Sequence, residues 1–234
     1  MMLCLSACLV FTGCDKDKDN ENPAGGVASK IEGTVVNGSA YDVDVIKGIV
    51  EERFEIASSD FANNKFSIDL PATLDDKHLE SMFEDDMNIN DGGVKGAFLD
   101  LRGYKSNKSV EYLEYARMPD LSATKVTFYY AVYVYVDRDA NVTGEFYEEE
   151  DYILKFNMNL KKGWNLIYMA DVFELISEDD YINTENYTTT PMSGYKWYFD
   201  AEDYFEEELG LKSASLKSST IADSKSKMFQ RFKK

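Results

Sequence analysis

Oxygen-bearing side chains recur at alternate positions in one segment of this 234-residue sequence. Asp137, Asp139 and Asn141 are separated by single residues, and Glu148 stands at the twelfth position of the same run. A loop with this spacing can wrap oxygen ligands around Ca²⁺, provided that glycine at its sixth position allows a sharp turn. Here the sixth position is Val142, and no flanking helices are expected. The sequence therefore leaves two alternatives, a Ca²⁺ site formed by those four oxygen-bearing residues or a polar hairpin loop.

Residues suited to catalysis are few. His78 is the only histidine, and without a second His or Cys it is expected as a surface or boundary residue, not a metal ligand. No Gly-x-Ser-x-Gly elbow accompanies any serine. The acidic runs at 148–151 and 178–180 are expected as solvated clusters among 43 acidic residues. We therefore predict no enzymatic activity and no cofactor other than the Ca²⁺ alternative.

Aromatic residues form the second candidate binding feature, since the chain holds 16 Tyr, 14 Phe and two Trp. On an exposed sheet face such rings can stack on sugars, and the candidate glycan-stacking residues are Tyr133, Tyr135, Trp164 and Trp197, from a pool that also holds Tyr129, Tyr147 and Tyr198. The same residues are typical of strand cores and cross-strand pairs. The sequence leaves both interpretations open.

The elements that carry these residues are predicted to be mostly strands, because apolar and polar residues alternate with period two. The run 152–161 alternates strictly and resumes at 164–170 after Lys162-Gly163, which predicts an antiparallel hairpin. The run 126–136 is apolar or aromatic on both faces, which predicts a central strand covered on both sides. Shorter strands are predicted at 31–36, 43–50, 54–57, 66–70, 94–101, 110–115 and 195–199, and short helices at 74–83 and 201–209.

Many short strands with few helices indicate a mainly β fold, an antiparallel β-sandwich with one or two short helices. The segments 31–35 and 66–71 resemble the opening of immunoglobulin-like or transthyretin-like modules, a resemblance that implies a sandwich and carries no functional residue. We expect one body spanning residues 29–210. A possible boundary lies at the polar, glycine-containing stretch 84–93.

The N-terminus carries an export signal. Residues 3–11 are apolar but much shorter than the ~20 residues needed to span a bilayer, and they end in small residues, as a signal peptide does. Thr12-Gly13-Cys14 then resembles a bacterial lipobox, which implies a signal peptide at 1–13 and lipidation of Cys14. The alternatives, an apolar core helix or a secretory signal without lipid, fit the combination of small residues, Cys and acidic linker less well. Several acyl chains hold a protein stably on a membrane.

The segment 14–28 is polar, charged and broken by Pro and Gly, which predicts a flexible tether. Its acidic start resembles the export signal of surface-exposed lipoproteins of the Bacteroidetes type, which implies a lipid-anchored position at the outer face of the outer membrane. A solvated linker of the same composition is the alternative. The expected partners are the membrane, through Cys14, and a glycan or surface protein.

Cysteine and charge set further bounds. All three cysteines (Cys4, Cys8 and Cys14) precede the body, so a disulfide or cysteine nucleophile is not expected there. Seven of 25 basic residues but one of 43 acidic residues lie in 211–234, so the rest carries a net charge of −24. This charge disfavours nucleic-acid binding. The basic tail 211–234 is expected to be disordered, to lie on an anionic membrane or to fold back on the acidic body.

These observations predict a non-enzymatic binding or structural module at the cell surface. The alternative is a glycan-binding accessory protein of a nutrient-uptake system.

Overall fold

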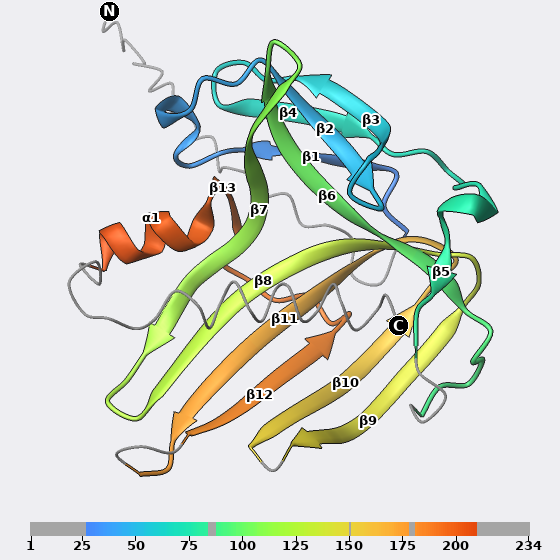
Figure 1. The fold of residues 1–234 in the computed structure, drawn as a ribbon, viewed down its shortest axis with the longest axis vertical. Helices are drawn as coiled ribbons and strands as arrows, with labels where there is room; N and C mark the ends of the chain where they lie inside the picture. Colours follow the sequence, from blue (N-terminus) through green and yellow to red (C-terminus); the bar gives the residue numbers. More distant parts are fainter. Residues whose placement is uncertain (1–26, 84–87, 150, 178–180, 210–234) are drawn as a thin grey trace, which may run out of the picture.

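Period-two alternation of apolar residues produces strands along most of the chain. A computed structural model describes residues 27–83, 88–149, 151–177 and 181–209 and shows a mainly β, sandwich-like fold (Figure 1). The expected signal, Cys14, residues 14–26 of the tether and the basic tail lie outside the described residues. The strands are β1 (Lys30–Thr34), β2 (Val45–Val50), β3 (Phe54–Asp60), β4 (Lys65–Asp69), β5 (Glu80–Ser81), β6 (Lys95–Lys105), β7 (Lys108–Leu121), β8 (Lys125–Val136), β9 (Ala140–Glu149), β10 (Tyr152–Leu160), β11 (Gly163–Leu175), β12 (Tyr181–Thr188) and β13 (Lys196–Phe199).

One large sheet joins strands from both ends of the described chain. Its order is β3-β2-β6-β7-β8-β11-β12-β10-β9, with β13 paired to β7 and β5 paired to β6, while β1 and β4 form a separate two-stranded ladder. Strands before and after the stretch 84–93 therefore share hydrogen bonds in this sheet. Among the described residues, no helix has the length and apolar character required to cross a membrane.

Strand β8 divides two hydrophobic cores, as its two apolar faces predicted. Tyr133 and Tyr135 pack into the core beneath the β1–β4 ladder, whereas Val134 and Val136 pack into the core on the opposite face. Alternate side chains of an extended strand point to opposite faces. Both faces of β8 are therefore covered, and the prediction of a central strand is confirmed.

The predicted hairpin of 152–161 with 164–170 is wrong in its pairing. Strand β12 lies between β10 and β11, parallel to β10 and antiparallel to β11. The alternation itself is correct, since Leu154, Phe156 and Met158 are all buried. However, Trp164 belongs to the other core. Strand β12, which comes later in the chain, therefore takes the place beside β10 that the sequence assigned to β11.

One of the two predicted helices is present. Helix α1 (Ala201–Glu208) begins after Asp200, whose carboxylate accepts a hydrogen bond from the backbone N–H of Asp203. The helix expected at 74–83 is wrong, because only a 3₁₀ turn at Asp76–His78 forms there. The next residues instead pair with β6 as strand β5. Tertiary pairing overrides the weak helical periodicity of this segment.

Candidate functional site: a fork between three strands

The predicted calcium loop is a tight turn followed by strand β9. The carboxylate of Asp137 accepts a hydrogen bond from the backbone N–H of Lys95 at 2.9 Å, and that of Asp139 accepts one from the backbone N–H of Lys162, also at 2.9 Å. The Asp139 carboxylate also lies 3.0 Å from the Nζ atom of Lys161. The two carboxylates therefore hold different neighbouring segments.

The four candidate calcium ligands do not converge. Asn141 and Glu148 both lie on β9, and seven residues of extended chain separate their Cα atoms by roughly 23 Å at about 3.3 Å per residue. The described parts of the chain hold no group of three or more His, Cys, Asp or Glu side chains arranged for a metal ion. The geometry of this segment corresponds to the hairpin alternative.

All four candidate stacking residues are buried in the core beneath the β1–β4 ladder, and two of them line no cavity. Trp164 is 1% exposed, and its indole Nε1–H donates to the carbonyl of Pro71 at 2.8 Å. The ring of Tyr135 packs edge-on against Trp164, with centroids 5.4 Å apart. Neither ring offers a face to a sugar, so the structure removes both from the glycan candidates. Tyr133 and Trp197, by contrast, line a cavity.

The lone histidine lies beside the β2–β3 turn. The Nδ1 atom of His78 is 3.0 Å from a carboxylate oxygen of Glu51, and its ring packs on Phe54 with centroids 4.5 Å apart. These contacts place His78 at the boundary between core and solvent, with its side chain 12% exposed.

Strands β6, β7 and β8 meet at a fork (Figure 1). Residues of all three strands line the cavity. The ladder between β6 and β8 ends at the pair Leu99–Tyr133. The ladder between β6 and β7 begins at Leu101–Leu113, and that between β7 and β8 begins at Tyr115–Ala131. The three ladders therefore do not include Asp100 of β6, Glu114 of β7 and Val132 of β8. Each of these three residues pairs on its other side, with Ile49, Tyr198 and Ile167 respectively.

This fork pocket has a volume of about 330 Å³. Buried rings of Tyr133 and Trp197 belong to the core beneath the β1–β4 ladder, whereas Tyr130 and Met169 belong to the opposite core. The pocket therefore connects the two faces of the sheet through the opening between strands. A 46% exposed residue, Tyr112, also lines it.

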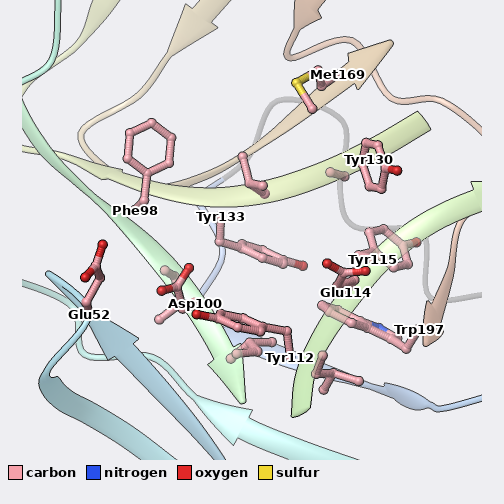
Figure 2. Close-up of a pocket in the computed structure, with 15 residues that line it drawn as sticks. Glu52, Phe98, Asp100, Tyr112, Glu114, Tyr115, Tyr130, Tyr133, Met169 and Trp197 are labelled. Carbon is pink, nitrogen blue, oxygen red and sulfur yellow. The ribbon is translucent and has the colours of Figure 1, made fainter. Parts of the chain in front are cut away.

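Charged groups lie on both sides of the fork. Figure 2 shows the rings of Tyr112 and Tyr133 between the carboxylates of Asp100 and Glu114. The Asp100 carboxylate forms an ion pair with Arg102 at 3.0 Å, and the Arg102 guanidinium lies over the Tyr112 ring, 4.5 Å from its centroid. One cation is therefore already recognised by this carboxylate and this ring together.

Glu114 connects the pocket with helix α1. Its Oε2 atom accepts a hydrogen bond from the backbone N–H of Ala201 at 2.9 Å. This N–H belongs to the first helical residue, where a carboxylate satisfies an otherwise unbonded donor and interacts favourably with the helix dipole. The helix thereby fixes one carboxylate at the fork.

The tyrosines of the pocket are phenols at neutral pH. Burial raises the pKa of Tyr133 and of Tyr112, and it raises the pKa of Tyr130 well above the usual value of 10.0, with nearby Glu114 and Glu202 adding to that shift. Their hydroxyls can donate hydrogen bonds but cannot serve as bases near pH 7. The lining side chains offer carboxylates, phenols and apolar groups, which suits binding better than covalent catalysis.

Sequence reasoning found Tyr133 and Trp197 but missed Asp100, Tyr112 and Glu114. All three stand in strands that alternate polar with apolar residues, so each looked like an ordinary solvent-facing position. A carboxylate within the apolar run 94–101 was the one available signal. The fork itself depends on the register of strands far apart in sequence.

Comparisons with known proteins found no match: no family model and no curated protein matches the sequence, and no solved structure matches the fold.

Proposed function

We propose that this protein is a lipid-anchored, non-enzymatic binding module of the bacterial cell surface, and that the fork pocket is its ligand site. The observation that carries the binding role is the pocket itself, a cavity of about 330 Å³ at the place where the ladders between β6, β7 and β8 meet. Ligand sites in proteins are typically concave and mostly apolar, with a few polar groups placed to orient the ligand.

Interruption of three ladders at one place supports this role. The three ladders shift register against one another at Asp100, Glu114 and Val132, and natural proteins keep such departures from regular structure most often at functional sites.

The anchor rests on the lipobox and is tested separately. Replacement of the acylated sulfur in Cys14→Ser should release the protein from the membrane fraction into the soluble fraction. Cys8→Ser is the matched control, since it changes a cysteine of the signal peptide and should leave the protein in the membrane fraction. Membrane association of the Cys14→Ser variant equal to that of the parent would exclude the lipid anchor.

The pocket is tested by filling it. Val132 lines the fork and is partly exposed, so Val132→Phe should occupy the opening. In a fragment screen followed by ¹H–¹⁵N spectra, ligands should shift signals around Tyr133 and Trp197, and Val132→Phe should abolish those shifts. Val110→Phe, at a 37% exposed site near the start of β7, is the control. Shifts that survive in Val132→Phe would place the ligand site elsewhere.

A second candidate function is glycan binding as an accessory of a nutrient-uptake system. The observation that favours it is Tyr112, which is 46% exposed where it lines the pocket. Its ring could stack on a sugar, with Tyr133 and Trp197 behind it. Retention on a polysaccharide affinity gel should then be lost in Tyr112→Ala and kept in Tyr147→Ala, which changes a 66% exposed tyrosine on β9.

A further inference from the structure

Exposed apolar side chains gather at one end of the large sheet. Nine large apolar residues are exposed in the described part of the chain, and four of them stand where β7 and β11 end and where β12 begins. These four, which we call the tip patch, are 44–60% exposed: Leu121, Leu175, Ile176 and Tyr181. Figure 1 shows the ends of β7 and β11 and the beginnings of β8 and β12 together at the lower left of the sheet.

Strand pairing joins the tip patch into one surface. Leu121 pairs with Val126 of β8, and Val126 pairs in turn with Phe173 of β11. Leu175 pairs with Tyr181 of β12. Directly paired residues share a face of a sheet, and so do residues two apart on one strand, such as Phe173 and Leu175. Leu121, Leu175 and Tyr181 therefore lie on the same face, across four strands.

Aromatic rings connect this surface with a core. The ring of Phe173 lies 6.1 Å from that of Phe128 and 6.0 Å from that of Tyr181, measured between centroids. Phe128 in turn packs against the core opposite the β1–β4 ladder. The tip patch is therefore the solvent-facing continuation of a packed core. Single exposed apolar residues are ordinary on a protein surface, whereas contiguous apolar patches mark sites of interaction.

Backbone hydrogen bonds hold the tip patch in place. The backbone N–H of Leu175 donates to the carbonyl of Thr124 at 2.8 Å, which ties the end of β11 to the β7–β8 turn. Within that turn the backbone N–H of Ser122 donates to the carbonyl of Lys125, also at 2.8 Å. A partner would therefore meet a surface that is already ordered, which reduces the entropy lost on binding.

Acidic residues surround the tip patch. Asp120 precedes Leu121, Glu174 precedes Leu175, and the carbonyl of Asp151 accepts a hydrogen bond from β12. All three side chains are exposed, and the sequence 178–180 that leads to Tyr181 adds three more carboxylates. The basic residues of the same segments are Arg117 and Lys125, so that six acidic residues and two basic residues give a net charge of −4. Such a rim attracts cations and repels anions.

From these observations we infer that the tip patch is a docking surface for a basic segment of a second protein. Apolar side chains of this partner would cover Leu121, Leu175 and Tyr181, and its Lys and Arg side chains would face the acidic rim. A second copy of this chain would bring an equal acidic rim against the first, and an anionic lipid surface would meet the same repulsion. A cationic protein segment matches both the apolar centre and the charge of the rim.

The position of the tip patch suits a partner that approaches from outside. Ala28, near the start of the described chain, pairs with Trp164 near the beginning of β11. Eleven residues of extended strand separate Trp164 from Leu175, which corresponds to roughly 36 Å at about 3.3 Å per residue. The tether therefore joins the body at the end of β11 opposite the tip patch. If Cys14 carries the lipid anchor proposed above, the patch lies far from the point of attachment. The docking surface itself does not depend on the fork pocket.

The test uses the whole chain, secreted without lipid as Cys14→Ser. The probe is a short peptide of alternating lysine and leucine, which combines the two chemistries of the partner. Each of two matched peptides removes one of them, the first by replacing lysine with glutamate and the second by replacing leucine with serine. Calorimetry measures the affinity, and ¹H–¹⁵N spectra locate the contact. We expect the lysine–leucine peptide to bind at least tenfold more tightly than either matched peptide and to shift signals of Leu121, Leu175 and Tyr181.

Uncharged substitutions test the apolar centre. The double variant Leu175→Gln/Tyr181→Gln changes two exposed positions, leaves the net charge unaltered and should weaken binding of the lysine–leucine peptide about tenfold. Val36→Gln/Val110→Gln is the matched control, since both valines are exposed outside the tip patch, and binding should be unchanged.

A second pair of variants tests the rim. Asp151→Asn/Glu174→Gln removes two carboxylates beside the tip patch and should weaken binding of the lysine–leucine peptide severalfold, with a smaller dependence on salt concentration. Asp69→Asn/Glu80→Gln is the matched control, because it removes two exposed carboxylates of other strands. Binding by this control should equal that by the parent.

Four results would overturn the inference. Equal affinity for the glutamate–leucine peptide would remove the role of charge, and peptide-induced shifts confined to Tyr133 and Trp197 would place the peptide in the fork pocket. A dimer in sedimentation equilibrium that dissociates in Leu175→Gln/Tyr181→Gln would identify a second copy as the occupant. Flotation of the protein with phosphatidylglycerol vesicles, lost in the same variant, would identify a lipid surface.

Discussion

Gly33 lies against the indole ring of Trp197, so closely that a Cβ atom on residue 33 would stand 2.3 Å from Cδ1 and 2.6 Å from Nε1 of that ring. The contact joins β1 to the wall of the fork pocket. Nearby, the backbone N–H of Val36 donates to the carbonyl of Trp197 at 2.9 Å. The short β1–β4 ladder therefore helps to fix the position of an aromatic wall residue.

This contact predicts that Gly33→Ala destabilises the protein. The added methyl group must displace a buried ring, and overpacking of this kind costs about 1–3 kcal/mol. Urea unfolding followed by circular dichroism measures the change. Gly92→Ala is the control, since nothing lies within 4 Å of a Cβ at that position, and stability should change by less than about 0.5 kcal/mol. Equal stabilities of the two variants would contradict the contact.

The β2–β3 turn predicts an opposite effect on stability and on binding. Glu51 and Glu52 have φ angles of 51° and 62°, a conformation that costs an L-residue other than Asn, Asp or Gly about 1–2 kcal/mol. Glu52→Gly removes that cost and should raise the free energy of unfolding by about 1 kcal/mol. Because Glu52 lines the fork pocket, the same change should weaken severalfold the binding of any fragment that shifts signals around Tyr133 and Trp197.

A second turn of the same kind provides the control for Glu52→Gly. Asn63 has a φ angle of 54°, but asparagine tolerates the left-handed region through its short polar side chain. Asn63→Gly should therefore raise the free energy of unfolding by only a few tenths of a kcal/mol and leave fragment binding at the fork pocket unchanged. A gain equal to that of Glu52→Gly would mean that the glutamate side chain adds no strain at the β2–β3 turn.

The sequence predicted a strand best where both faces of that strand are buried. The run that became β8 has no polar face, and the structure indeed covers both of its faces. The sequence predicted the pairing of strands poorly, because pairing depends on segments that are distant in the sequence and adjacent in space. The residues of β12 (Tyr181–Thr188) include four consecutive polar residues at 183–186, so no strand was predicted there and the strand that separates β10 from β11 was missed.

The sequence also predicted part of the candidate site. Tyr133 and Trp197 were selected as aromatic residues of strands, and both line the pocket. Their joint position at a fork follows from three ladders that shift register against each other. No local pattern of residues encodes such a shift, so Glu114 had no signal in the sequence that distinguished it from a solvent-facing carboxylate, and Asp100 had only its position within the apolar run 94–101.

Buried tyrosines predict unfolding at alkaline pH. Burial raises the pKa of Tyr198 and of Tyr168 to about 12, whereas an unfolded chain has a tyrosine pKa of about 10. Between these values the unfolded state loses protons that the folded state keeps, so stability falls as pH rises. The contribution is complete below about pH 10 and is lost by about pH 12. Absorbance at 295 nm should therefore rise together with loss of the circular dichroism signal.

One substitution isolates this effect. Tyr168→Phe removes a titrating hydroxyl from the buried face and should move the alkaline unfolding midpoint to higher pH. Tyr181→Phe, at a 47% exposed position on β12, should leave that midpoint where it is. Titration of all 16 tyrosines at the ordinary pKa, before any unfolding, would contradict the burial of these two rings.

The Asp137 turn predicts a loss of stability at acidic pH. Partial burial acts to raise the pKa of Asp137, but hydrogen bonds from the Arg138 guanidinium and from the backbone N–H of Lys95 outweigh it and lower the pKa overall. A carboxyl whose folded-state pKa is lowered stabilises the protein above its unfolded pKa of about 4, and this contribution disappears as pH falls through the folded-state value.

Asp137→Asn should therefore cost about 1–2 kcal/mol at pH 7, where it removes charge-assisted hydrogen bonds. Once the pH falls below the lowered folded-state pKa of Asp137, the variant and the parent should unfold at nearly the same urea concentration, since the parent carboxyl is then protonated as well. Asp60→Asn, an exposed position at the end of β3, is the control and should change stability by less than about 0.5 kcal/mol at either pH. If calcium bound at Asp137 in place of these hydrogen bonds, added Ca²⁺ would raise the melting temperature of the parent and not that of Asp137→Asn; the turn geometry predicts no response to Ca²⁺ in either protein, because the Lys95 and Arg138 donors already occupy this carboxylate.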